Sequence, residues 1–139
     1  MLTLSQFFRS CSVLPNSIKN HTLQQFKQVF SSQEAKNAFN VLYAFVCEYE
    51  IPRVKSESNI IYIGQTKQSL TNRYMMYANA FCSGENSSLY KYIIEHYGAI
   101  SIYYLQFETK ESLKQAETEL LNDYYKLYKE YPPKNFQRR

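Results

Sequence analysis

The chain contains no tryptophan, and it has few glycines, prolines and cysteines: three, four and three among 139 residues. The cysteines, Cys11, Cys47 and Cys82, are odd in number and widely spaced, which argues against a disulfide framework or a metal-binding motif. This cysteine usage favours the reducing cytoplasm. His21 and His96 belong to no zinc-binding pattern. No apolar run approaches the ~18 residues of a membrane span, so we expect no membrane partner.

Acidic residues are absent from the first 33 positions. An acid-poor, serine-containing start is typical of an organellar presequence, but the helical spacing of Leu23, Phe26 and Phe30 favours a folded helix. The formal net charge of +4 suits a partner that carries phosphates without requiring one. We therefore divide the chain into an N-terminal helical extension, residues 1–40, and one compact domain, residues 41–139.

Three apolar runs predict strands: VLYAFVC from residue 41, IIYI from residue 60 and AISIYYLQF from residue 99. The segment EYEIPRVKSESN between the first two carries charge, a proline and serines, which predicts a solvated loop. The expected fold class is α/β in the broad sense (α+β), with a small three-stranded antiparallel sheet flanked by helices. Its first two strands form a hairpin with a long connection.

Helical periodicity and capping residues predict four helices after residue 30. The first is short, with Ser31 and Glu34 as a capping box. The second runs over 69–81 from a Ser69 cap, and the third ends before Gly98. The apolar stripe expected on that third helix is Leu89, Tyr92, Ile93 and Tyr97. The last spans 112–128, capped by Ser112 with Gln115 and stopped by two prolines.

The last predicted helix carries a carboxylate within its apolar stripe. Glu117 lies four residues from both Leu113 and Leu121, whereas Glu119 lies on the polar face. A buried carboxylate is costly unless something compensates it. Glu117 therefore pairs with a base such as Arg73, reaches the rim of the fold, or serves as a metal ligand or acid in a cleft.

The stretch NIIYIGQTKQSLTNRY, residues 59–74, combines features of a phosphate site. Gly64 follows the apolar run, where a glycine lets a backbone or substrate approach closely. Arg73 can hold a phosphate with two parallel hydrogen bonds, and Tyr77 shares its helical face. Tyr43 and Tyr62, on neighbouring predicted strands, can point their hydroxyls toward one place. Together with Glu117, these residues indicate a phosphodiester site with one acidic metal ligand.

In this order the motifs resemble those of the GIY-YIG endonucleases, over about residues 41–136. Val41-Leu42-Tyr43 is similar to the first half-motif, keeping its tyrosine without its glycine and isoleucine, and Tyr62-Ile63-Gly64 matches the second. The remaining matches are Leu70 with Arg73, Tyr77, Glu117 with Leu120, Leu121 and Tyr124, and Asn135.

The resemblance implies metal-dependent hydrolysis of DNA, either by nicking one strand or by cutting both. Glu117 would hold one divalent cation, Mg²⁺ or alternatively Mn²⁺, and Arg73 would clamp the phosphate. Tyr43 is the candidate base that takes a proton from water, with Tyr62 and Tyr77 orienting that water. Gly64 and Asn135 would support the site. Such nucleases are carried by phages and mobile elements, which implies action in the host cytoplasm.

Further nucleic-acid contacts are expected from Lys67, Lys134, Arg138 and Arg139. The helices of residues 1–40 either add phosphate contacts, cover the sheet or mediate a homodimer, and we favour the last two roles. The alternative function is a catalytically silent module that binds nucleic acid or a protein, because VLY departs from the family's first half-motif.

Overall fold

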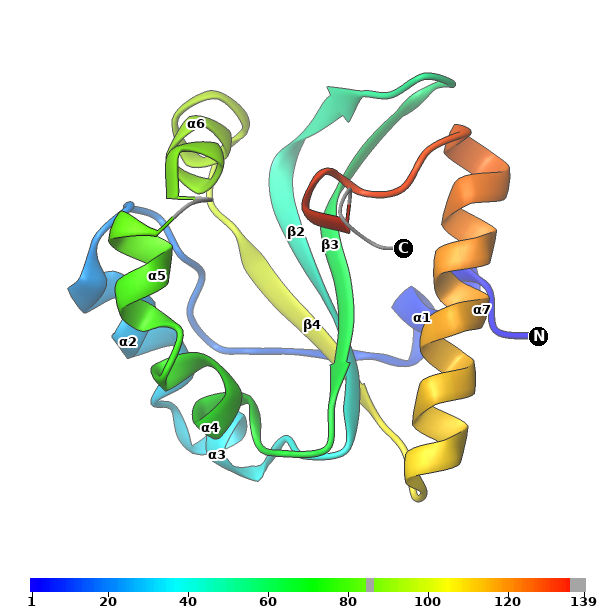
Figure 1. The fold of residues 1–139 in the computed structure, drawn as a ribbon, viewed down its shortest axis with the longest axis horizontal. Helices are drawn as coiled ribbons and strands as arrows, with labels where there is room; N and C mark the ends of the chain where they lie inside the picture. Colours follow the sequence, from blue (N-terminus) through cyan, green and yellow to red (C-terminus); the bar gives the residue numbers. More distant parts are fainter. Residues whose placement is uncertain (85–86, 136–139) are drawn as a thin grey trace.

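The computed structural model describes residues 1–84 and 87–135, and in this part of the chain seven α-helices surround a four-stranded antiparallel sheet (Figure 1). The strands are β1 (Ser12–Val13), β2 (Val41–Pro52), β3 (Glu57–Thr66) and β4 (Ser101–Gln106), in the order β1-β4-β2-β3. The α+β class is confirmed. The sheet has one strand more than expected, because Ser12 and Val13 pair with Tyr104 and Tyr103.

The predicted long loop between the first two strands is wrong. β2 and β3 continue through it, and residues 53–56 form the turn, closed by a hydrogen bond from Arg53 N to Ser56 O. The charged residues are accommodated because the outer part of this hairpin is exposed to solvent. Arg53 ties its tip to the end of the last helix through a 2.9 Å salt bridge with Glu130. Charge indicated exposure here, and a protruding hairpin provides exposure as well as a loop does.

The helices differ from expectation mainly at their ends. Their bounds are α1 (Leu4–Ser10), α2 (Leu23–Phe30), α3 (Gln33–Asn37), α4 (Leu70–Met75), α5 (Ala78–Ser83), α6 (Ser87–Tyr97) and α7 (Lys110–Tyr128), followed by the 3₁₀ turn η1 (Pro133–Asn135). Ser69 caps α4 as predicted, but Ser32 rather than Ser31 caps α3, and Thr109 rather than Ser112 caps α7. The helix predicted over 69–81 is two helices, which meet at Met76 and Tyr77.

Two groups of helices cover the two faces of the sheet (Figure 1). Helices α2 to α6 pack on the face that carries Tyr43 and Phe45, and α1 and α7 pack on the face that carries Leu42 and Ala44. On α6 the buried residues are Tyr90 and Ile93, while Tyr92, expected in the stripe, is 53% exposed. Tyr90 therefore faces the same core as Tyr43.

Residues 1–40 belong to the same folded unit as the rest of the chain. They supply β1 to the sheet, α2 and α3 to one core and α1 to the other, so these helices cover the sheet as expected. The first helix is held to α7 by hydrogen bonds from Leu2 N to Glu119 and from Leu4 N to Asp123. The bond from Leu2 lowers the pKa of Glu119. Formation of a homodimer through these helices stays a prediction.

Asn135 holds the edge strand of the sheet. Its side-chain amide accepts a hydrogen bond from Ile63 N and donates one to Ile63 O, both at 2.9 Å. Asn135 is buried, and β3 is a terminal strand of the sheet, so the amide pairs with backbone groups that no further strand satisfies. In Figure 1, η1 crosses in front of β3 between α6 and α7. Asn135 thus fixes the C-terminal turn against the strand that carries Tyr62 and Gly64.

We expect Asn135→Ala to lower the free energy of unfolding by about 1–3 kcal/mol, because it leaves the buried N–H and C=O of Ile63 without partners. Urea denaturation followed by circular dichroism measures this change. Asn79→Ala is the control, since Asn79 is exposed on α5, and it should change stability by less than ~0.5 kcal/mol. Equal stability of the two variants would contradict the structural role of the Asn135 amide.

Candidate active site

Gly64 lies between two tyrosine side chains. Tyr43 is its partner across the β2–β3 ladder, and Tyr62 precedes it on the same face of β3. A Cβ atom added to Gly64 would lie 2.6 Å from Cε2 of Tyr62 and 2.9 Å from Oη of Tyr43. The prediction that Gly64 ends its strand is wrong, because β3 continues to Thr66. The missing side chain therefore admits the protein's own phenols.

Tyr43 is enclosed in the core, at 1% exposure. Its hydroxyl lies 2.6 Å from the hydroxyl of Tyr74, which is also buried. Burial and the neighbouring Tyr62 raise the pKa of Tyr43, and they outweigh the hydrogen bond from Tyr74 and the charge of Arg73, which lower it. This net direction is opposite to the one that a base at neutral pH needs.

Tyr74 was missed in the sequence. Its signal was its position four residues after Leu70, because both side chains then face the core side of α4. Tyr74 stacks on Phe30 of α2 with ring centroids 4.7 Å apart, so the N-terminal segment fixes the partner of Tyr43. Burial raises the pKa of Tyr74 well above its ordinary value.

Glu117 belongs to α7, the helix that covers the sheet face opposite to the one that carries Tyr43. It is half-buried on α7, which packs against the edge strand β3. Burial raises the pKa of Tyr62, the charge of Arg73 lowers it, and the carboxylate of Glu117 raises it. Tyr43 experiences the same two charges. Arg73 and Glu117, from different helices, therefore act on the same two phenols.

Arg73 lies half-buried among phenols, with its Cζ atom 5.0 Å from the ring centroid of Tyr74. Burial alone would lower the pKa of Arg73, but four tyrosines outweigh it and raise that pKa. They are Tyr74, Tyr43, Tyr62 and Tyr77. The structure thus brings together the five residues proposed as catalytic from the sequence, although Tyr77 precedes α5 and does not share one helix with Arg73.

A pocket of about 260 Å³ adjoins this cluster. Arg73 and Tyr77 line it together with Gln68, Asn72 and Met76, whereas Tyr43, Tyr62 and Glu117 are not among its lining residues. Arg73 and Tyr77 are therefore accessible to a ligand from the side of α4. A phosphate in this pocket would meet a fixed cation together with amide and phenol donors.

The carboxylate of Glu117 is the candidate metal ligand. Within residues 1–84 and 87–135, no three His, Cys, Asp or Glu side chains gather as a metal-binding group. One carboxylate beside neutral phenols does not suit zinc, which takes three or four nitrogen or sulfur ligands. It does suit Mg²⁺, which is commonly bound by one or two carboxylates, waters and substrate phosphates. The donor set therefore fits the hard cation expected from the sequence.

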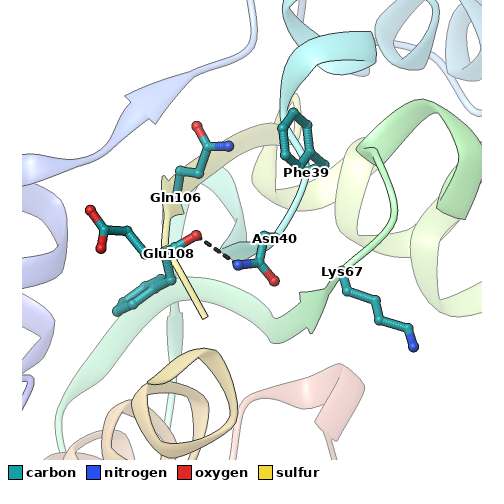
Figure 2. A pocket seen from close by; sticks show the side chains of 6 residues that line it. Phe39, Asn40, Lys67, Gln106 and Glu108 are labelled. Carbon is teal, nitrogen blue, oxygen red and sulfur yellow. Dashed lines mark hydrogen bonds between the residues drawn. The ribbon is translucent and has the colours of Figure 1, made fainter. Parts of the chain in front are cut away.

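The remaining nucleic-acid candidates lie in different places. Lys134 is half-buried, with Nζ 4.7 Å from the ring centroid of Tyr90. Lys67 is exposed beside a depression of about 600 Å³ that Phe39, Asn40, Gln106, Phe107 and Glu108 also line. Figure 2 shows the Lys67 side chain pointing away from Glu108, while the Asn40 amide donates to Phe107 O. Arg138 and Arg139 lie outside the described residues.

We call Tyr43, Tyr62, Tyr74 and Tyr77, which surround Arg73, the tyrosine cluster. The larger depression beside Lys67 lacks the grouping of Arg73 and Glu117 around phenols that this cluster has. Its Asn40 amide is committed to the backbone of Phe107, and Arg73 and Glu117 are not among its lining residues. We therefore place the candidate active site at the tyrosine cluster.

Comparison of the chain with protein-family models, with curated proteins and with solved structures gives no match. The resemblance to GIY-YIG endonucleases therefore stays a prediction from the sequence motifs. None of the helices in the described part of the chain has the length and apolar character needed to cross a membrane.

We expect the protein to lose stability as the pH rises above ~10. Burial holds the pKa values of Tyr43, Tyr74 and Tyr90 above that of an unfolded tyrosine, near ~10, so only the unfolded chain releases these protons there. The stabilisation is complete below pH ~10 and decreases at higher pH by about 1.4 kcal/mol per unit for each buried phenol. Urea denaturation between about pH 8 and 11 measures the slope.

Tyr43→Phe should reduce this slope by the contribution of one phenol. Tyr49→Phe is the matched control, because Tyr49 is 65% exposed and should leave the slope unchanged. The assignment of Tyr43 to the buried, protonated state is wrong if the two variants show the same slope as the parent protein.

We expect Gly64→Ala to destabilise the fold by about 1–3 kcal/mol, because Tyr43 is too tightly packed to move away from an added methyl group. Tyrosine ring resonances in NMR spectra should shift for Tyr43 and Tyr62. Gln65→Ala, one residue along β3, is the control and should preserve both resonances. An unperturbed tyrosine pair in Gly64→Ala would contradict the close approach.

Proposed function

We propose that this protein is a metal-dependent DNA endonuclease, of the nicking or double-strand type, whose site is formed by Tyr43, Tyr62, Arg73, Tyr77 and Glu117. The observation that supports the proposal is the gathering of Arg73, Tyr74 and Tyr77 beside the Tyr43 and Tyr62 side chains at Gly64, with Arg73 and Tyr77 open to a pocket. The charges of Arg73 and Glu117 both act on Tyr43 and Tyr62. A fixed cation, a single carboxylate and acid–base groups are the components that phosphodiester hydrolysis requires. The order of these residues along the chain is also that of the GIY-YIG endonucleases.

Each residue has a proposed role. Arg73 binds the scissile phosphate and offsets the negative charge that develops on its oxygens. Glu117 would hold one Mg²⁺ or Mn²⁺, which when bound polarises the phosphate and stabilises the departing oxyanion. Tyr77 lines the pocket beside Arg73 and orients the phosphate or the attacking water.

Tyr43 remains the candidate base, but its burial requires a path for the proton. Tyr62 is more exposed than Tyr43, and the centroids of their rings lie 6.0 Å apart. We therefore place Tyr62 against the attacking water and Tyr43 behind it. In the ionised form of Tyr43, the water would give its proton to the Tyr62 oxygen while Tyr62 gives its own proton to Tyr43. Arg73 lowers the pKa of both Tyr43 and Tyr62 and thereby favours their ionised forms.

The second candidate function is a silent module that binds nucleic acid or a protein without cleaving it. The burial of Tyr43 and its hydrogen bond with Tyr74 favour this alternative, because together they describe a structural core tyrosine. In that case Arg73 and Tyr77 bind a phosphate or another anion, and Glu117 only balances the guanidinium charge.

Supercoiled plasmid incubated with the protein and Mg²⁺ should be relaxed or linearised, and EDTA should abolish the reaction. Glu117→Gln should reduce the rate by at least ~100-fold, since it removes the charged ligand and keeps the side-chain shape. Glu111→Gln, an exposed carboxylate in the first turn of the same helix, should cleave at the parental rate. Gel electrophoresis of time points measures all four reactions.

Binding of DNA without cleavage, across several DNA and RNA substrates, would support the silent module instead. Cleavage that persists in EDTA or in Glu117→Gln would exclude the proposed metal site and indicate a contaminating nuclease or different chemistry.

A further inference from the structure

Lys134 is held in place by its neighbours in the chain. It follows Pro133, whose ring fixes the backbone, and precedes Asn135, which is bonded to Ile63 through both ends of its amide. A further hydrogen bond from Asn135 N to Pro132 O closes the turn. The backbone of Lys134 is therefore fixed next to β3, in contrast to an ordinary surface lysine.

The ammonium group of Lys134 lies on an aromatic platform. Nζ is 4.7 Å from the ring centroid of Tyr90, which is buried in the core shared with Tyr43. Burial raises the pKa of Tyr90 well above its ordinary value, so the phenol stays neutral and does not form an ion pair with the lysine. The contact is a cation–π interaction, which orients the ammonium group without neutralising it.

The charge of Lys134 is left without a carboxylate partner in the described part of the chain. The one salt bridge among these residues joins Arg53 to Glu130. Burial lowers the pKa of Lys134 to about 8, because the partly buried ammonium group has lost water. A cation in this situation gains more from an arriving anion than a solvated lysine does.

The tyrosines connect Lys134 to the candidate active site. Tyr77 packs against the hydrophobic core in which Tyr90 and Tyr43 are buried, and burial, followed by Tyr77, Tyr62 and Tyr43, raises the pKa of Tyr90. Tyr77 in turn lines the pocket that contains Arg73. The row Arg73, Tyr77, Tyr90 and Lys134 thus has a cation at each end and two tyrosine side chains between them.

Resting on the nuclease function proposed above, we infer that Lys134 binds a phosphate of the same DNA strand that Arg73 holds, one position or more from the scissile bond. The two cations would fix the strand along the tyrosine row. Lysine suits this role because it acts as a point charge on phosphate oxygens and reads no base sequence. This contact positions the strand and adds affinity without specificity.

The test is DNA binding by the full chain in a Glu117→Gln background, which prevents cleavage during the measurement. Fluorescence anisotropy with a short labelled duplex of mixed sequence gives the affinity between about 50 and 200 mM salt. Lys134→Gln should reduce the magnitude of the slope of log affinity against log salt by about 0.9, the value for one phosphate contact. Lys134→Arg should restore it, because arginine keeps the charge.

Lys126→Gln is the matched control, since Lys126 is exposed near the end of α7 and should leave the slope as in the parent. Thermal unfolding of each variant verifies that the fold is intact. An unchanged slope in folded Lys134→Gln would overturn the inference while the nuclease proposal stands. Failure of the parent to bind any duplex, together with absence of plasmid cleavage by the unmodified protein, would overturn both.

Discussion

The hydrogen bond between the hydroxyls of Tyr43 and Tyr74 joins the sheet to the helix that carries Arg73. Tyr43 lies near the start of β2, an inner strand of the sheet, and Tyr74 is buried between that strand and Phe30 of α2. Because Arg73 immediately precedes Tyr74, fixing Tyr74 also fixes where the guanidinium group emerges. Gly64 belongs to the same constraint, since only its missing side chain leaves room for Tyr43 and Tyr62. The geometry of the candidate site therefore depends on the packing of tyrosines.

This arrangement has opposing consequences for chemistry. The same burial that positions Tyr43 raises its pKa and makes its ionisation costly. Arg73 reduces the cost of ionising both Tyr43 and Tyr62, while Glu117 increases it. A divalent cation on Glu117 would reverse the sign of the charge at that position, which is why the proposed function includes one. The charge at Glu117, with or without a bound cation, thus distinguishes the catalytic proposal from the silent one.

The C-terminal turn completes the site from a distant part of the sequence. Asn135 satisfies the edge of β3, and the same turn presents Lys134 to Tyr90. Both contacts join residues that are far apart in the sequence. The packing of α7, which carries Glu117, against β3 does so as well. Residues 1–40 contribute equally, because Phe26 and Phe30 of α2 pack around Tyr74. The site is therefore supported by all parts of the described chain, and no separate extension stands beside it.

Local patterns in the sequence determined the fold class, the approximate position of three of the four strands, the Ser69 cap and the conflict at Glu117, because each depends on neighbours within one or two turns. Only the tertiary structure decided that the charged segment after Cys47 extends the hairpin, that Ser12 and Val13 form a fourth strand, and that Tyr90 rather than Tyr92 is buried. It also decided the burial of Tyr43. Exposure, strand pairing and pKa depend on contacts between residues far apart in the chain. The periodicity of one segment therefore cannot predict these properties.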